Sequence, residues 1–256
     1  MRLATWNINS IRMRLPGILD WLEKAKPDVL LMQEIKCESQ EFPAMDFLAA
    51  GYKVYAFGQR SYNGVAIASL YPIESVCENL PTFKDDSQAR YLEARIKGVR
   101  VASVYVPNGN PVDTDKFTYK LDWFKRFKAH AAKLLKGEEL VVLGGDFNVL
   151  QGALDADDIT KWEGDALYHK DVRAAFREVL NLGYTEIFRV LHPEERAYSF
   201  WDYKNNAWAQ DRGLRLDHFL LSPEAVDKVK DCTIDKAPRG QEKASDHTPV
   251  VLDIEE

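Results

Sequence analysis

The sequence predicts an α+β fold in which two mostly antiparallel β-sheets pack as a sandwich, with flanking helices outside and a functional site at one rim. Short apolar segments rich in β-branched and aromatic residues recur along the whole chain, as expected for strands. Tight turns such as Lys97-Gly98 separate neighbouring segments and favour antiparallel hairpins over uniform βαβ crossovers. No linker rich in Pro, Gly or Ser divides the chain, so residues 1–256 are predicted to form a single domain.

The individual elements follow from composition and spacing. Ten segments are predicted as strands, at residues 2–8, 28–33, 54–57, 64–69, 91–96, 100–106, 140–143, 198–203, 217–221 and 248–254. Helices fit best at residues 13–24, 114–135 and 171–182. In the last of these, Asp171 is the predicted N-cap and Gly183 the predicted C-cap. Sheets of this kind bury their apolar faces against each other and against the helices.

Charge and cysteine usage limit the class of protein. The 34 Lys and Arg residues against 40 Asp and Glu give a formal net charge of −6, which disfavours nucleic-acid binding through a global basic field. A local basic face around a carboxylate-rich metal site is still compatible with this charge. Cys37, Cys77 and Cys232 are scattered and form no Cys-x-x-Cys pair, so neither a disulfide framework nor a thiolate zinc site is indicated.

Targeting and assembly signals are sparse. No apolar run is long enough to span a bilayer, and the N-terminus enters a strand-like pattern without the succession typical of a signal peptide. A cytoplasmic location is therefore the expectation, with no membrane partner. A monomer is also expected, because the chain has no long heptad seam.

Polar residues recur where the predicted strands end. The stretch ELVVLGGDFNV, residues 139–149, runs from a buried strand into Asp146 and Asn148, and the first strand ends in Asn7-Ile8-Asn9. Period-2 alternation places both members of each pair on one face. Four further strand ends carry Gln33-Glu34, Tyr105 to Asn108, Arg215 to His218, and Ser245-Asp246-His247. Each could be an ordinary turn or capping residue by itself, but a single pocket at the rim explains all six together.

The residue types in this pocket indicate its chemistry. Carboxylate and carboxamide oxygens, without Cys and with little His, suit Mg²⁺ or Mn²⁺ better than zinc. Glu34 is the first choice as a direct ligand. An Asp can act as base toward water, an Asp–His pair can orient a charged imidazole, and Asn or Tyr can donate to phosphate oxygens. These parts fit hydrolysis of a phosphate ester.

Eight motifs then make a specific resemblance. In chain order they are TWNINSIR, PDVLLMQEIK, NGVAIAS, VYVPNGN, GGDFNV, SFWDY, RGLRLDHFLLSP and SDHTPVV, which extend over essentially the whole chain. Together they resemble the exodeoxyribonuclease III type of apurinic/apyrimidinic endonuclease, within the endonuclease/exonuclease/phosphatase superfamily. The Asp-x-Asn and Ser-Asp-His elements are shared across that superfamily, whereas VYVPNGN, SFWDY and RGLRLDHFLLSP resemble its DNA-repair branch.

The resemblance implies a metal site and a set of catalytic residues. Glu34 would be the principal metal ligand, with Asn7 and Asn9 beside it and Asp246 close by. The catalytic side chains would be Tyr105, Asp146, Asn148, Asp217 and His247. Among these, the Asp-x-Asn pair would activate the attacking water and position it or the phosphate. The tyrosine would contact the scissile phosphate or the leaving oxygen, and the second aspartate would orient the histidine, whose charged form would stabilise the transition state.

Substrate contacts are also implied by the resemblance. Arg90 matches an arginine near the DNA backbone, while Phe200, Trp201, Leu214 and Leu216 match positions that form an apolar pocket for a flipped, base-free sugar. Any one of these apolar residues could equally be a plain core residue. Leu214 is expected to distinguish a pocket role from a core role most clearly, because it follows Gly213 in a turn where an apolar side chain is less expected to be buried. Nearby candidates for phosphate contacts are Arg212 and Arg215.

The expected activity is a divalent-metal-dependent DNA-repair phosphodiesterase. It would incise double-stranded DNA 5′ to abasic sites, leave a 3′-hydroxyl, and trim blocked 3′ ends as a 3′–5′ exonuclease. The alternatives are a superfamily phosphatase acting on a lipid headgroup, inositol phosphate or RNA, and a regulator that binds nucleic acid without cutting it. Departures from the family pattern are Ser10 in place of a usual Gly and Glu186 in place of a frequent Asp. The stretch after Asn148, residues 149–176, also follows the pattern only loosely and is called the divergent loop below.

Overall fold

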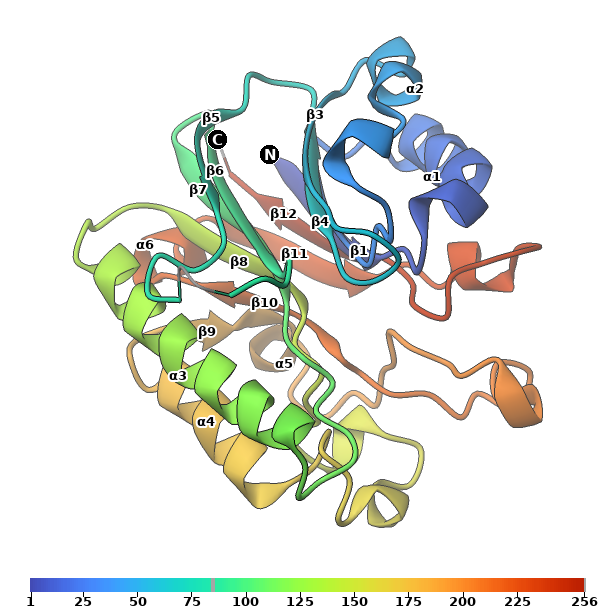
Figure 1. Ribbon diagram of the computed structural model, residues 1–256, viewed down its shortest axis with the longest axis vertical. Helices are drawn as coiled ribbons and strands as arrows, with labels where there is room; N and C mark the ends of the chain where they lie inside the picture. The colour runs from blue at the N-terminus through green and yellow to red at the C-terminus, as the bar shows by residue number, and fades with distance from the viewer. Residues whose placement is uncertain (84–85, 256) are drawn as a thin grey trace.

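The computed structural model describes residues 1–83 and 86–255 and shows two six-stranded sheets packed face to face (Figure 1). The first sheet has the order β11-β12-β1-β2-β4-β3 and contains β1 (Arg2–Asn7), β2 (Val29–Gln33), β3 (Lys53–Phe57), β4 (Val65–Ser69), β11 (Val229–Ile234) and β12 (Val250–Ile254). The second has the order β5-β6-β7-β8-β10-β9 and contains β5 (Glu74–Glu78), β6 (Tyr91–Ile96), β7 (Val99–Tyr105), β8 (Val141–Asp146), β9 (Thr185–Glu186) and β10 (Asp217–Leu221). Of the strand pairs in the described chain, β1–β2 and β7–β8 are parallel and the rest antiparallel. The predicted sandwich is confirmed.

Helices cover the outer face of each sheet (Figure 1). On the first sheet lie α1 (Ile11–Ala25) and α2 (Ala44–Ala49), and on the second lie α3 (Asp115–Leu135) and α4 (Lys170–Leu180). The short helices α5 (Ile187–Leu191) and α6 (Pro223–Val226) flank β10. Single 3₁₀ turns occur at η1 (Ser39–Glu41), η2 (Ala153–Asp155), η3 (Ile159–Trp162), η4 (Lys204–Asn206) and η5 (Ala237–Gly240). None of the helices described here is long and apolar enough to cross a bilayer.

The core has three apolar layers, because both sheets are buried on both faces near their centres. The middle layer joins the sheets through residues such as Leu31 and Phe219. Gly144 on β8 allows this close approach, since a Cβ there would lie 2.5 Å from the Phe219 ring and 2.9 Å from Leu31 Cδ1. The two outer layers seat the helices, with Trp21 of α1 on one side and Trp123 of α3 on the other. This packing fixes the strand ends on which the site is built.

Several boundary predictions were wrong. The segment 198–203 is no strand: it makes only isolated bridges, from Phe200 to Leu214 and to His247, as it crosses the rim between the sheets. Three strands were missed, β5, β9 and β11, and all three lie at sheet edges. The cap assignments for α4 were also wrong. His169 is the N-cap, and its Nδ1 accepts from the backbone N–H of Asp171 at 3.3 Å, while the C-cap is Asn181 and Gly183 lies beyond it at φ 123°.

Candidate active site

Strand register brings the predicted polar residues to one rim. In the second sheet, Asp146 at the end of β8 lies opposite Tyr105 at the end of parallel β7, and opposite Asp217 at the start of antiparallel β10. In the first sheet, Asn7 ends β1 and lies opposite Gln33, which ends parallel β2. Carboxyl ends of parallel strands meet at one edge of a sheet, so both sheets present their polar residues to the same rim.

The carboxamide of Asn7 links the two sheets at this rim. Its Nδ2 donates to Glu34 Oε1 at 2.8 Å and to Asp146 Oδ2 at 2.9 Å. Its Oδ1 accepts from the backbone N–H of Asn9 at 3.1 Å. Asn7 is fully buried, so these bonds are shielded from water and fix the two carboxylates relative to each other.

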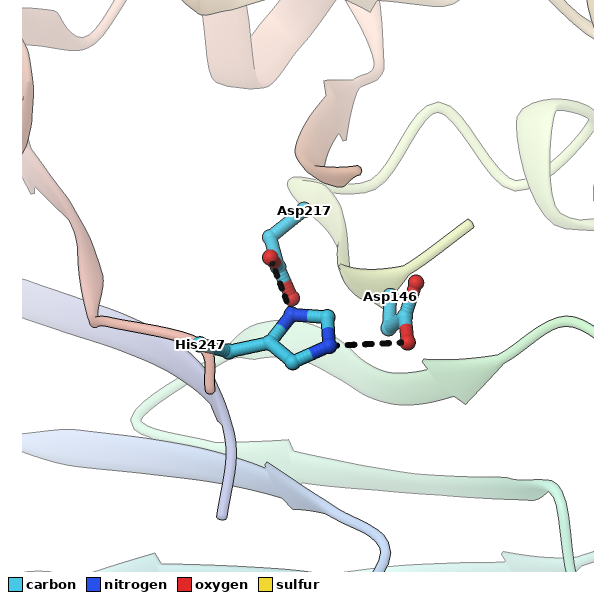
Figure 2. A group of neighbouring side chains, drawn as sticks. All are labelled: Asp146, Asp217 and His247. Carbon is cyan, nitrogen blue, oxygen red and sulfur yellow. Dashed lines mark hydrogen bonds and ion pairs between the residues drawn. The ribbon is translucent and has the colours of Figure 1, made fainter. Parts of the chain in front are cut away.

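A chain of three side chains runs across the site: Asp217, His247 and Asp146 (Figure 2). His247 Nδ1 lies 2.8 Å from Asp217 Oδ2, and its Nε2 lies 3.8 Å from Asp146 Oδ2. Ser199 Oγ donates to the same Asp217 oxygen at 2.6 Å and itself accepts from the backbone N–H of Asp217. The Phe200 ring packs edge-on against the imidazole with centroids 4.9 Å apart. All three members of the chain are buried, so their charges interact strongly.

This arrangement changes the proton affinity of both ends of the chain. Burial alone would lower the pKa of His247, but the Asp217 and Asp146 carboxylates outweigh it and raise the pKa to about 10. Burial raises the pKa of Asp146 to about 7, helped by Asp217 and Glu34 and opposed by His247 and the Asn7 hydrogen bond. At neutral pH the imidazole is therefore charged. The carboxylate of Asp146 then has the proton affinity that suits a general base.

Oxygen donors converge next to this chain in a way that fits a cation. The Lys36 ammonium lies 2.8 Å from Glu34 Oε2 and 2.5 Å from Asn9 Oδ1, so the two oxygens already share one positive charge. Asn9 Nδ2 donates to Asp246 Oδ1 at 2.9 Å, which places that carboxylate beside them. Burial would raise the pKa of Glu34, but Lys36 and Asn7 outweigh it and lower the pKa. Hard oxygen donors of this kind are those that Mg²⁺ prefers.

On the other flank, Tyr105 and Asn108 line a hollow, and Asn148 is hydrogen-bonded to Asn108. Asn148 N–H donates to Asp146 Oδ1 at 2.9 Å, and Asn148 Oδ1 accepts from Asn108 Nδ2 at 3.2 Å. Arg90 stacks over the Tyr105 ring at 4.6 Å. The hollow has a volume of about 530 Å³. Its lining is rich in carboxamides and cations, namely Gln59, Asn63, Gln88, Asn108, Asn110, Arg90 and Lys116.

The structure corrects the predicted environment of the apolar residues. Leu214 is only 2% exposed and packs with Leu150, Leu167 and Leu216, so the expectation that its turn would leave it free is wrong. The divergent loop after Asn148 folds over it and pairs with it through an Ala156–Leu214 bridge. Replacing Leu214 by Ala would therefore create a cavity and lower the free energy of unfolding by ~2–5 kcal/mol.

Trp201 and Phe200, two further residues predicted to line the apolar pocket, differ in their burial. Trp201 is fully buried, and its indole N–H donates to Asp211 Oδ1 at 3.0 Å. Phe200, by contrast, keeps partial exposure beside His247. Of the four predicted pocket residues, Phe200 is therefore the one that is partly exposed and contacts His247.

The two arginines suggested as phosphate contacts also differ. Arg212 is exposed. Arg215 is fully buried, with Nε 2.8 Å from Asp155 Oδ1 and Nη1 3.0 Å from Glu186 Oε1, so a phosphate contact for Arg215 is wrong. Glu186, a departure from the family pattern, is thus the buried partner of Arg215, and it also accepts from the backbone N–H of Arg189 as the N-cap of α5.

The sequence analysis assigned no role to three polar residues of this rim, namely Lys36, Asn108 and Ser199. Lys36 lies two positions after Glu34, but both follow the end of β2 with left-handed φ values of 51° and 52°, so strand alternation gives no signal for it. Asn108 was predicted only as part of the polar strand end Tyr105 to Asn108, without a function of its own. Ser199 contacts Asp217 from a segment 18 residues away, and no local signal indicates that contact.

Comparison with known proteins agrees with this geometry. A model of the Endonuclease/Exonuclease/phosphatase family matches residues 4–247. An AP endonuclease from Archaeoglobus fulgidus is 38% identical, with each chain covered completely and a TM-score of 0.96. A 3′ phosphatase from Neisseria, solved with a product DNA hairpin, is 36% identical with the same coverage and a TM-score of 0.98. Exodeoxyribonuclease III of Haemophilus influenzae is 28% identical over 98% of this chain and 98% of its own length.

Proposed function

The chain belongs to the endonuclease/exonuclease/phosphatase family, and on that basis we propose that it is a DNA-repair phosphodiesterase that depends on a divalent metal ion. Its substrate is double-stranded DNA, which it incises 5′ to an abasic site to leave a 3′-hydroxyl, and whose blocked 3′ ends it trims. One observation carries this proposal: the buried Asp217–His247–Asp146 chain, joined to Glu34 through Asn7. The protein acts as a monomer.

The metal in this proposal is Mg²⁺, with Mn²⁺ as a substitute. Glu34, Asn9 and Asp246 would hold it through oxygen atoms, with Asn7 orienting Glu34. When bound, the ion neutralises phosphate charge and polarises the ester. The Lys36 ammonium supports this assignment, because it already lies against oxygens of Glu34 and Asn9 and so marks a position that favours a cation.

The protein residues carry the proton transfers of hydrolysis. Asp146 accepts a proton from water, whose oxygen forms the new bond to phosphorus while the bond to the 3′-oxygen breaks. His247, charged and oriented by Asp217, donates to a phosphoryl oxygen and stabilises the negative charge that develops there. Asn148 positions the water or the phosphate. Burial raises the pKa of Tyr105 well above its ordinary value, so its phenol stays protonated and can donate to the phosphate or the leaving oxygen.

Selection of damaged DNA follows from the cost of extruding a nucleotide. An abasic sugar has no base to unstack or unpair, so it enters a site at lower cost than an intact nucleotide. Phe200 beside His247 offers an apolar surface to such a sugar. In the adjoining hollow, Arg90 and Lys116 suit the phosphate backbone.

The competing functions are less consistent with the site. A regulator without catalysis has no need for an intact Asp217–His247–Asp146 chain. A phosphatase of lipid headgroups, inositol phosphates or RNA would share the catalytic chain, so substrate specificity separates it from the repair enzyme.

The test uses two duplexes, one with a single synthetic abasic site and one with a 3′-phosphate end, assayed with Mg²⁺ and with EDTA. We expect incision 5′ to the abasic site and phosphate removal, both only with Mg²⁺. Activity on inositol phosphates or RNA without activity on either duplex would contradict the repair assignment. Full activity in EDTA would contradict the metal mechanism.

A further inference from the structure

Lys120 of α3 is a buried cation outside the set of residues assigned above. It is 0% exposed, and its ammonium donates to three backbone carbonyls: Asn148 O at 2.7 Å, Asn108 O at 3.0 Å and Ala166 O at 3.1 Å. These bonds use all three of its N–H donors. All three acceptors are neutral, and no carboxylate in the described part of the chain is paired with it by direct contact.

Such burial is unfavourable unless the group has a specific role. An ammonium removed from water without a paired carboxylate loses hydration that carbonyl oxygens replace only in part. Burial lowers the pKa of Lys120 to about 7, although Asp146 and Asp165 at longer range act to raise it. The neighbouring sequence accommodates the side chain, because Gly109 has φ +82° and a Cβ there would lie 2.6 Å from Lys120 Cδ. Glycine is therefore needed at position 109, because the methylene groups of Lys120 lie where a Cβ would be.

The three carbonyls belong to separate segments that meet under the active site. Asn108 follows β7 and Asn148 follows β8, and their side chains bond to each other at 3.2 Å. Asn148 also has a left-handed backbone at φ 48°, which needs support from its surroundings. Ala166 comes from the divergent loop, and its N–H donates to Asn110 Oδ1 at 3.1 Å. One ammonium therefore anchors the backbone on which both asparagine amides stand.

We propose that Lys120 is a positioning residue: it fixes the backbone of Asn108 and Asn148 so that their amides face the scissile phosphate. This rests on the proposed function, in which Asn148 positions the water or the phosphate, and extends that role to the neighbouring amide of Asn108. Lys120 is buried beneath the rim and does not touch the substrate. Its loss should therefore lower the rate of the chemical step more than the affinity for DNA.

The test replaces Lys120 by Met, which keeps the apolar stem and removes the donors, and by Gln, which keeps one amide donor group. The matched control is Tyr184→Phe, which removes a buried hydroxyl that donates to Ala131 O on the same helix at 3.0 Å, away from the site. Each variant is measured for kcat on both duplexes, for DNA Kd in EDTA, and for Tm. We expect kcat to fall about 10- to 100-fold in Lys120→Met, with a smaller fall in Lys120→Gln, a nearly unchanged Kd, and wild-type kcat in Tyr184→Phe.

Four outcomes would overturn the inference. The first is wild-type kcat in a folded Lys120→Met variant. The second is a rise in Kd or KM with kcat unchanged, which would make Lys120 a binding residue. The third is a loss of kcat in Tyr184→Phe in proportion to its loss of Tm, and the fourth is failure of both Lys120 variants to fold. Either result would make the effect one of stability. Inactive wild-type protein on both duplexes would instead overturn the proposed function, and this inference with it.

Discussion

Asp146 shows how one residue acquires its chemistry from its neighbours. It is an ordinary aspartate at the end of β8, yet burial raises its pKa to about 7 while Asn7 and the charged His247 hold its carboxylate in place. The motif GGDFNV indicated this residue because the spacing of Asp and Asn on a strand is local information. The shift itself depends on Asp217 and Glu34, which come from distant parts of the chain, and no local pattern could have given it.

Replacing Asp146 by Asn should retain the fold and DNA binding and slow turnover by about 10²- to 10⁴-fold, the usual loss for a missing general base. In the wild type, the base is active when deprotonated, so kcat should rise as the pH rises through about 7. Rate profiles between pH 5 and 9, with binding measured in parallel, check both points. Near-normal cleavage by the variant at saturating metal would remove Asp146 from this role.

Ser10 is a second residue whose conformation can be tested. It stands where relatives usually carry Gly and adopts φ 91°, ψ 110°, a region that favours glycine, and its side chain makes no capping bond. Ser10→Gly should therefore stabilise the protein by about 1 kcal/mol, because the relieved strain exceeds the added chain entropy of Gly. Urea unfolding measures this directly. A decrease in stability would mean that the serine side chain contributes contacts that outweigh the strain.

At the scale of elements, the central strands, the long helices and the edge strand β3 could be predicted, and the other three edge strands could not. β2 and β4 are buried along their whole length, so their sequences are almost entirely apolar. The missed strands β5 and β11 carry charged residues and expose much of their surface, as edge strands do to avoid pairing with other chains. The burial of Leu214 was missed for a related reason. It depends on a loop about 60 residues earlier in the chain, and that loop follows the family pattern only loosely.

The same loop is held in place by a buried ion cluster formed by Arg215, Asp155 and Glu186, and a substitution in this cluster tests how much it stabilises the fold. Arg215 joins Asp155 of the loop to Glu186 at the end of β9. Arg215→Met should cost about 3–5 kcal/mol at pH 7, because it leaves the buried Glu186 without an arginine partner and leaves Asp155 with Arg189 alone. A matched control is Arg212→Met, an exposed arginine three residues away, which should change stability little.

The loss of stability caused by Arg215→Met should become smaller as the pH falls. Burial would raise the pKa of Asp155 and of Glu186, but Arg215 and His218 outweigh it and lower both. Carboxyl groups with a lowered pKa contribute stability above their unfolded pKa of about 4, and that contribution is lost as the pH falls below it. The difference in free energy of unfolding between wild type and Arg215→Met should therefore decrease toward acid pH. A difference that stays constant from pH 7 to pH 3 would show that lost packing, and not charge, is responsible.

At the scale of the whole molecule, the active site exists only when the two sheets are packed together. Asn7, Glu34 and His247 belong to the ends of the first sheet, while Tyr105, Asp146 and Asp217 belong to the second. The Asn7 and His247 contacts cross between them. A ligand that binds this junction binds only the folded protein, so its binding free energy adds to the free energy of unfolding of the entire chain.

Metal binding should therefore be visible as global stability, independently of catalysis. Mg²⁺ at ~100 times its Kd should raise the free energy of unfolding by about 2.7 kcal/mol. Glu34→Gln should remove most of this gain and raise the Mg²⁺ concentration needed for cleavage, because the carboxamide is a weaker ligand than the carboxylate. The control is Glu23→Gln, an exposed acid on α1, which should keep the full Mg²⁺ effect. Calorimetry of the three proteins with Mg²⁺ and with EDTA measures the difference. If Glu34→Gln gained as much stability from Mg²⁺ as the wild type, the ion would bind elsewhere, and the Lys36 ammonium would be the cation that Glu34 and Asn9 are built to hold.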